Sequence, residues 1–416
     1  MIAAAPTPRE RSPRLPPAPR RRSDQRLAGV VRRADPTRRV AIVRASRSRS
    51  EVAEALTDPS PEVARAAISR LIELEGPQAV GVLRERLLSV SLPVVADVAG
   101  ALRSLGDTAA VDAAIDGLTG DPYPRRLAAA RALGVLGDQR ARGPLRSALG
   151  DPTGGVRAAA LRALGRLGPH PDVADECLRL LRDADAQVRI AAIRTIMRIA
   201  PRAAGELSAL ASDPDLLVRR EVAQHVAWLP SAAVPRLFTD LNAAVRQAAA
   251  LAAGPQQAPL LARLVAHDPN SDVRRAAARS LGNLAPDAAA DGLLGGIADS
   301  DSLVRATAVH SLERSLTHAG AVARLTEELT SPDPQRRRWS VYALAHLKAA
   351  LASSDVWRLA DDPEPDVRLA VIQGAAVILD DSEPLLLYMA TDPDASVRAG
   401  AGTWLARWRD ARAADA

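Results

Sequence analysis

Hydrophobic positions along the chain recur with a helical spacing, and one short pattern returns many times. The segment 268–284, DPNSDVRRAAARSLGNL, shows this pattern clearly. Its apolar residues fall on one face of a helix, namely Val273, Ala277, Leu281 and Leu284. Asp268 is a residue type that caps helix N-termini, and Pro269 suits a first helical position because it has no N–H to leave unpaired. The pattern predicts an amphipathic helix with Asp268 as its N-cap.

Centring the pattern on Arg274 defines a register position that returns every 27 to 32 residues. The register positions are Ala64, Val95, Arg126, Arg157, Arg189, Arg219, Arg246, Arg274, Arg305, Arg337, Arg368 and Arg398. Valine immediately precedes ten of the twelve, and a residue that can cap a helix stands six residues earlier, or five before Arg126. These cap residues are Asp58, Ser89, Asp121, Asp151, Asp183, Asp213, Asp240, Asp268, Asp299, Ser331, Asp362 and Asp392, and proline follows eight of them. A period near thirty residues with one capped helix per copy predicts a solenoid of stacked units.

A length of 416 residues would normally suggest two or more domains, but the repetition points to one stack of units. A stack grows by adding copies, so we expect residues 26–416 to form a single elongated solenoid. Asp35, Pro36 and the following RRVAIVRAS look like a degraded half-repeat, so we expect 26–50 to cap the stack. Within each later unit, a less regular first helix, such as 77–88 or 144–149, precedes the patterned second helix.

Residues 1–25 differ from the rest of the chain, because they combine six prolines with Arg20, Arg21 and Arg22 and have no apolar periodicity. This composition predicts a disordered arm. Two interpretations of the arm remain open. It is either a basic extension that attracts nucleic acid, an acidic partner or a membrane surface, or a solvated extension without a partner.

The charge and the cysteine content narrow the class of protein. Residues 1–50 hold 14 arginines against three acidic residues, while the remainder holds 41 basic and 46 acidic residues, so the N-terminal 50 residues make the net charge of +6 positive. The single cysteine, Cys177, excludes a disulfide framework and fits a reducing compartment. No apolar stretch approaches the length of a membrane span, and no secretory signal is present, so we expect a cytoplasmic protein.

The run Asp-Pro-x-x-x-Val-Arg-x-x-Ala-x-x-Ala-Leu-Gly, seen in DPTGGVRAAALRALGRLG from Asp151, resembles HEAT repeats. It is most similar to the short, alanine-rich variety named after phycocyanobilin lyases, and the resemblance covers nearly the whole chain. It implies an all-α fold, a right-handed α-solenoid of about twelve two-helix repeats whose second helices line a concave face. It also implies a charged ladder of Asp and Arg from successive units, interrupted at Ala64 and Val95, where the register arginine is missing.

The register arginines from Arg126 to Arg398 are not our candidates for ligand binding. Each stands five or six residues after a residue that can cap a helix, and the cap is an aspartate in all but one of these units. This position suits an arginine that satisfies neighbouring caps and backbone carbonyl groups. We expect these arginines to stabilise the stack.

Positions one, five and nine after the register residue turn away from the apolar face, and we expect them to point into the concave side. In the eight units from Arg126 to Arg337, these 24 positions hold ten arginines and no carboxylate, whereas 54 arginines in 416 residues would give about three. The candidate binding residues, which we call the arginine stripe, are Arg131, Arg162, Arg166, Arg194, Arg198, Arg220, Trp228, Arg275, Arg279, His310, Arg314, Arg338, Tyr342 and His346. The spacing of Arg338, Tyr342 and His346 brings these three side chains together on one helix.

An arginine-lined face with a few aromatic residues suits acidic peptides, phosphate backbones or stacked bases. A solvated helix face with scattered aromatics is the alternative. Common enzyme motifs are missing, including GxxxxGK[ST], HExxH, GxSxG and a dinucleotide-binding fingerprint. Cys177 and the histidines outside the stripe show no metal-ligand spacing. The sequence therefore predicts no cofactor and no metal, and it favours binding over catalysis.

Three functions remain at this point. The first choice is a non-enzymatic scaffold that binds an acidic protein or peptide along the arginine stripe. The second is a nucleic-acid-binding HEAT-like protein, with or without an enzyme activity similar to that of alkylpurine DNA glycosylases, although the stripe offers no carboxylate as a catalytic residue. The third is a lyase or helper protein in a modification or biosynthetic pathway, for which no pigment or thiol-attachment site is identifiable. The sequence makes no prediction of the oligomeric state.

Overall fold

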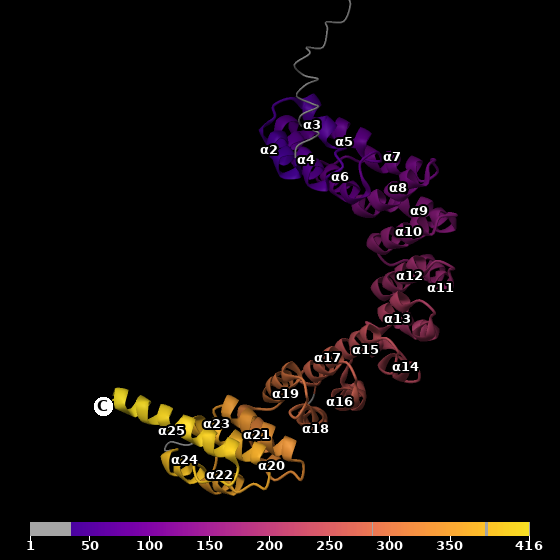
Figure 1. The fold of residues 1–416 in the computed structure, drawn as a ribbon. Helices are drawn as coiled ribbons and strands as arrows, with labels where there is room; N and C mark the ends of the chain where they lie inside the picture. Colours follow the sequence, from indigo (N-terminus) through magenta and orange to yellow (C-terminus); the bar gives the residue numbers. More distant parts are fainter. Residues whose placement is uncertain (1–34, 285, 379–381, 416) are drawn as a thin grey trace, which may run out of the picture. The chain divides into compact units, whose positions relative to one another are not determined.

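The computed structural model describes residues 35–284, 286–378 and 382–415, and every regular element within these ranges is a helix (Figure 1). These residues divide into two compact units, one that ends at Leu167 and one that begins at Gly168. The predicted arm, 1–25, lies outside the described ranges. The described part of the predicted capping segment 26–50 contains α2 (Pro36–Ala45) and the first residues of α3 (Arg49–Ala55).

The unit that ends at Leu167 consists of two layers of helices. The patterned second helices pack against one another in chain order and are α2, α4 (Pro61–Glu75), α6 (Leu92–Ser104), α8 (Tyr123–Leu136) and α10 (Gly154–Leu167). The first helices are shorter and partly of the 3-10 type: α3, η1 (Gly76–Ala79), α5 (Val80–Arg86), α7 (Ala109–Gly117), η2 (Gln139–Ala141), α9 (Arg142–Ser147) and η3 (Ala148–Gly150). The predicted first helices 77–88 and 144–149 are therefore present but broken by 3-10 turns.

The unit that begins at Gly168 repeats the same plan. Its second helices are α12 (Ala186–Ile199), α13 (Leu216–Ala223), α15 (Ala243–Leu251), α17 (Ser271–Leu281), α19 (Ser302–Ser315), α21 (Pro334–His346), α23 (Pro365–Ile378) and α25 (Ala395–Asp415). The first layer contains α11 (Pro171–Leu180), η4 (Pro201–Ser212), α14 (Val234–Phe238), η6 (Pro255–Gln257), α16 (Ala258–His267), α18 (Pro286–Gly296), α20 (His318–Glu328), α22 (Ser353–Ala360) and α24 (Glu383–Met389). Neighbouring second helices pack directly, except that α19 and α21 approach each other less closely than the other pairs.

Small side chains fill the core, as the composition requires. The valines that precede the register residues are fully buried, as Val156, Val188 and Val273 show. Alanines follow them at helical spacing and are also buried. Because these side chains are short, the second helices approach closely, and Gly134 on α8 marks such an approach. A Cβ atom at Gly134 would lie 2.9 Å from the Cα atom of Ala163 on α10.

This close approach predicts opposite effects for two glycine-to-alanine substitutions. Gly134→Ala is expected to destabilise the first unit by about 1–3 kcal/mol, because the backbone of α10 must move to make room for the methyl group. Gly100→Ala on α6 meets open space and should stabilise the chain by about 0.5–1 kcal/mol through helix propensity. Urea unfolding of the full chain measures the free energy of unfolding of both variants. If both substitutions changed this free energy in the same direction, the packing described here would be contradicted.

The predicted N-cap positions are wrong by two residues. Asp268 lies before α17, and its Oδ1 accepts the backbone N–H of Asn270 at 2.9 Å. Asn270 is the N-cap, and its side chain accepts the N–H of Val273. Pro269 accordingly belongs to the turn and is not the first helical residue. The physical reason is that aspartate bonds readily to its own backbone two residues on, so it closes the turn and leaves the cap to the next polar residue. The same shift holds for the helices capped by Asp185, Asp215, Asn242, Asp301 and Asp333.

Candidate functional site

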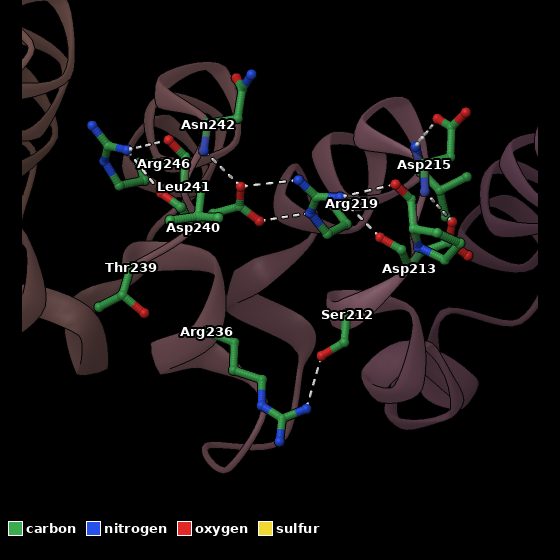
Figure 2. Close-up of polar contacts among 12 residues, drawn as sticks. Ser212, Asp213, Asp215, Arg219, Arg236, Thr239, Asp240, Leu241, Asn242 and Arg246 are labelled. Atoms are coloured by element: carbon green, nitrogen blue, oxygen red, sulfur yellow. Dashed lines mark hydrogen bonds and ion pairs between the residues drawn. The ribbon is translucent and has the colours of Figure 1, made fainter.

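Register arginines and aspartates of successive repeats form a ladder along one edge of each unit. Arg219 represents the arrangement: Nε donates to Asp240 Oδ2 at 2.7 Å, and Nη1 donates to the carbonyl oxygen of Asp213 at 2.9 Å (Figure 2). The arginine therefore ties the turn before its own helix to the turn of the following repeat. Equivalent ion pairs, which we call rungs, join Arg39–Asp58, Arg126–Asp151, Arg189–Asp213, Arg246–Asp268, Arg274–Asp299, Arg337–Asp362 and Arg368–Asp392.

These contacts confirm the predicted structural role of the register arginines in the rungs. Figure 2 also shows Arg236 donating to Ser212 Oγ at 2.8 Å, a separate link between α14 and the end of η4. The ladder is interrupted where the resemblance implied, because Ala64 and Val95 are fully buried apolar residues. A further break, at Arg305, was not predicted, although Ser331 in place of the next aspartate was visible in the sequence.

None of the fourteen residues of the arginine stripe is buried, which confirms that these positions turn away from the core. Arg131 on α8 and Arg162 and Arg166 on α10 belong to the first unit. The other eleven belong to the second unit and lie on α12, α13, α17, α19 and α21, apart from Trp228. Helix α13 ends at Ala223, so Trp228 lies on the short 3-10 turn η5 (Val226–Trp228) beyond it. The predicted concave placement of the stripe stays a prediction.

Part of the stripe is engaged within the stack. Arg194 and Arg338 bind carboxylates of the next repeat, while Arg314 donates to carbonyl groups at the end of α17. The Oη atom of Tyr342 donates to the side-chain amide oxygen of Gln373 on α23. The contacts are Arg131–Leu92, Arg194–Glu221, Arg275–Asp272, Arg314–Gly282, Arg314–Arg279, Arg338–Asp366 and Tyr342–Gln373. These side chains stabilise the joints between repeats or their own helix.

The Glu221 carboxylate is the strongest electrostatic feature next to the stripe. It is only 5% exposed, and Arg194 contacts both of its oxygens at 2.9 and 2.6 Å. Burial acts to raise the pKa of Glu221, but the neighbouring His225 and Arg194 outweigh burial and lower this pKa to about 2. Sequence inspection missed Glu221, because it stands two residues after a register position and outside the stripe pattern.

A second group of stripe residues is available to a partner. Arg198, Arg220, Arg279 and Trp228 are exposed, and their side chains make no hydrogen bond or ion pair within the described part of the chain. Arg166, His310 and His346 are in the same situation. The indole of Trp228 is 62% exposed, which is unusual for so large an apolar side chain.

An apolar residue missed in the sequence adjoins this group. Leu251 occupies stripe position five of its repeat, ends α15 and is 54% exposed. The chain just after it passes close to η5, because a Cβ atom at Gly254 would lie 3.6 Å from Ala227 Cβ. Trp228 and Leu251 therefore belong to adjacent repeats. In the sequence they lie between the stripe arginines of α12 and α13 and those of α17, and we call this exposed pair the apolar centre. We call Arg198, Arg220, Trp228, Leu251 and Arg279 the central stripe.

The remaining chemistry of the described residues offers little for catalysis. Cys177 is fully buried, and burial raises the pKa of its thiol to about 12, so the thiol is not a reactive nucleophile. Within the described ranges, no three His, Cys, Asp or Glu side chains are grouped as metal ligands. None of the helices searched in those ranges has both the length and the apolar character that crossing a membrane requires.

Two layers of paired helices, tied by an Arg–Asp ladder, define this protein as an α-solenoid repeat protein. The chain belongs to the HEAT-repeat family, since the HEAT repeats model matches residues 48–133, 111–178, 230–313 and 257–345. The resemblance noted from the sequence is thus confirmed, as is the all-α solenoid fold. No curated protein matches the chain significantly by sequence.

Solved structures with a similar fold are numerous and distant in sequence. The chain resembles importin beta at 14% identity over 90% of this chain and 62% of that chain, with a TM-score of 0.48. It resembles the complex of CpcE and CpcF of phycocyanin lyase from Nostoc sp. PCC7120 at 22% identity over 57% of this chain and 94% of that chain, with a TM-score of 0.31. An engineered protein matches at 20% identity over 86% of this chain and 98% of that chain, with a TM-score of 0.32.

Proposed function

We propose that this protein is a non-enzymatic scaffold that binds an acidic segment of a partner protein along the arginine stripe. The observation that carries this proposal is the central stripe, where exposed arginines whose side chains bind no other described residue flank an exposed tryptophan and leucine. Solenoids present such extended surfaces because each repeat contributes one strip of side chains.

The chemistry of the central stripe favours an acidic peptide over a neutral one. Arginine binds carboxylates through two parallel N–H donors, and such charge-assisted bonds are stronger than neutral ones. Tryptophan and arginine also dominate the energetics of many protein interfaces. Because Trp228 and Leu251 supply apolar area, the expected ligand carries acidic residues around an apolar residue. A nucleic acid would use the same arginines, and it is the alternative that the experiment below separates.

Binding of a fluorescent, glutamate-rich peptide that contains one leucine tests the scaffold. The variant with Arg198→Glu, Arg220→Glu and Arg279→Glu is expected to bind at least about tenfold more weakly, since each charge-assisted hydrogen bond contributes roughly 1.5–3 kcal/mol. Trp228→Ala should weaken binding as well, without loss of helicity, because the indole is mostly exposed.

A matched control separates the stripe from net charge. Arg182, Arg202 and Arg263 are exposed, lie outside the stripe in the second unit, and can be reversed to glutamate together. Equal losses in the two triple variants would contradict the stripe as the binding surface. Binding to random-sequence RNA that exceeds peptide binding and falls steeply with salt would instead favour a nucleic-acid partner, because phosphate contacts release counterions.

A further inference from the structure

Arg305 on α19 has lost the carboxylate that its position normally binds. The following repeat carries Ser331 where the rungs have an aspartate. Ser331 Oγ still accepts the backbone N–H of Asp333, at 3.3 Å, so the turn is closed as elsewhere. A hydroxyl group supplies no negative charge, however, and among the described residues no acid lies within ion-pair distance of Arg305. The ladder is therefore open between α19 and α21.

The guanidinium of Arg305 nevertheless keeps the orientation found in intact rungs. Its Nη1 donates to the carbonyl oxygens of Asp299 and Ser300 at 2.7 and 3.0 Å. Arg274 makes the same bond to its own turn at 2.8 Å, and its Nε and Nη2 then bind the two oxygens of Asp299 at 2.6 and 2.8 Å. By this comparison, the Nε and Nη2 edge of Arg305 is oriented for a bidentate carboxylate that none of the described residues supplies.

Trp339 covers the face of the Arg305 guanidinium and does not occupy this edge. The guanidinium carbon lies 3.6 Å from the ring centroid of Trp339, and that of Arg338 lies 5.0 Å from the same ring. Stacking occupies the π face of a guanidinium, while its N–H donors point outward in the plane. Helices α19 and α21 are also less closely packed than other neighbouring second helices.

Electrostatics at the joint favour an anion. Burial lowers the pKa of Arg305, and the positive charge of Arg338 acts in the same direction, whereas the charges of Asp299 and Asp301 act to raise this pKa without outweighing burial. The hydrogen bonds that arginines donate to aspartates have the opposite effect in intact rungs, where they raise the pKa of Arg274 and of Arg337. A carboxylate beside Arg305 would offset both the burial and the like charge.

We propose that a carboxylate from outside the chain binds the Nε and Nη2 edge of Arg305, in the place that an aspartate fills in the intact rungs. The ligand is an acidic side chain or C-terminus of a partner protein, or a small organic acid with the same group. Arg305 is not part of the arginine stripe, so this site does not depend on the proposed function. Binding completes the ladder and holds α19 against α21.

Hydrogen–deuterium exchange of the full chain at pH 7 tests this site. Exchange of α19, α20 and α21 is compared in sodium acetate and in sodium chloride of equal ionic strength, and separately with micromolar glutamate-rich peptide. A carboxylate should slow exchange there about tenfold, the change that roughly 1.4 kcal/mol produces. Ser331→Asp completes the rung from within, so it should slow exchange in either salt and remove the carboxylate effect. Ser331→Asn keeps a turn acceptor without a charge and should behave like the unsubstituted protein.

Each result of the exchange experiment either supports or overturns a carboxylate site at Arg305. Protection by micromolar peptide identifies a protein partner as the source of the carboxylate, and protection by acetate alone identifies a small acid. No protection by either would overturn the site. Equal protection in the Ser331→Asp variant would also overturn it, because the effect would then lie elsewhere on the surface.

Discussion

Arg246→Met is expected to destabilise the second unit by about 3–5 kcal/mol, because it removes one partner of a buried ion pair. The side chains of Arg246 and Asp268 are only 11% and 2% exposed, and two hydrogen bonds of 2.6 and 2.8 Å join them. Without the arginine, the carboxylate of Asp268 stays buried with the Asn270 N–H as its remaining donor. Loss of the bonds from Arg246 to the carbonyl groups of Asp240 and Leu241 adds to the effect.

The loss should be local, since each repeat contacts only its neighbours. Hydrogen–deuterium exchange is therefore expected to rise mainly in α15 and α17, and urea unfolding gives the overall change. Two comparisons test the cause. Replacing both partners, by Arg246→Met with Asp268→Leu, should cost less than the single change, because no buried charge remains unpaired. Breaking the exposed pair Arg65–Asp97, whose side chains are 51% and 39% exposed, should cost less than about 1 kcal/mol. Similar losses at both pairs would contradict burial as the cause.

The periodicity was sufficient to predict the solenoid, because the same buried apolar positions and the same turn residues before the second helix recur along the chain. The Val, Ala and Leu positions specify the packed face, and the aspartate and arginine positions specify the ladder. Pattern alone placed the N-cap at the aspartate, since aspartate is a frequent cap. Only the structure shows that Asp268 and its equivalents close the turn, which leaves the cap to the residue two positions later.

The candidate site was less predictable than the fold. The helical spacing of a residue predicts whether its side chain is exposed, but it does not predict whether that side chain forms an ion pair with another repeat. Stripe positions were correctly expected to face away from the core. Whether an arginine there is available depends on neighbours about thirty residues away, as Arg194 and Glu221 show. Trp228 departs from the helical spacing for another reason: α13 ends early, so the indole lies on a 3-10 turn. Leu251 also occupies a stripe position, but it was missed because only arginines, histidines and aromatic residues were chosen as candidates there.

Acid is expected to unfold the second unit between about pH 4.5 and pH 2, and Glu221 should be a major cause. Its pKa is about 2 in the folded chain against an ordinary value of 4.5. The unfolded chain therefore binds a proton in this window that the folded chain does not bind. The stabilisation is complete above the ordinary pKa and is lost as the pH falls through the folded pKa. The slope from this one group approaches about 1.4 kcal/mol per pH unit.

The aspartates of the rungs also make the folded chain less stable in acid. At Asp240, burial acts against ionisation, but the hydrogen bonds from Arg219 and from the Asn242 N–H, together with the charges of Arg219 and Arg246, outweigh burial and lower the pKa of Asp240. At Asp392, the hydrogen bond from Arg368 is the main cause of a lowered pKa. Stability that depends on these carboxylates is likewise present above their ordinary pKa and lost in acid.

Urea unfolding at a series of pH values, with Glu221→Gln as the key variant, measures the contribution of this carboxylate. The glutamine keeps an oxygen for Arg194 but cannot titrate, so the pH dependence between 4.5 and 2 should decrease by about one proton relative to the unsubstituted chain. Glu206→Gln, at an exposed glutamate without an ion pair in the described part of the chain, should leave the profile as it was. If the two variants gave the same pH dependence, Arg194 and His225 would not hold the carboxylate in its ionised form, and acid would have to act through the rung aspartates alone.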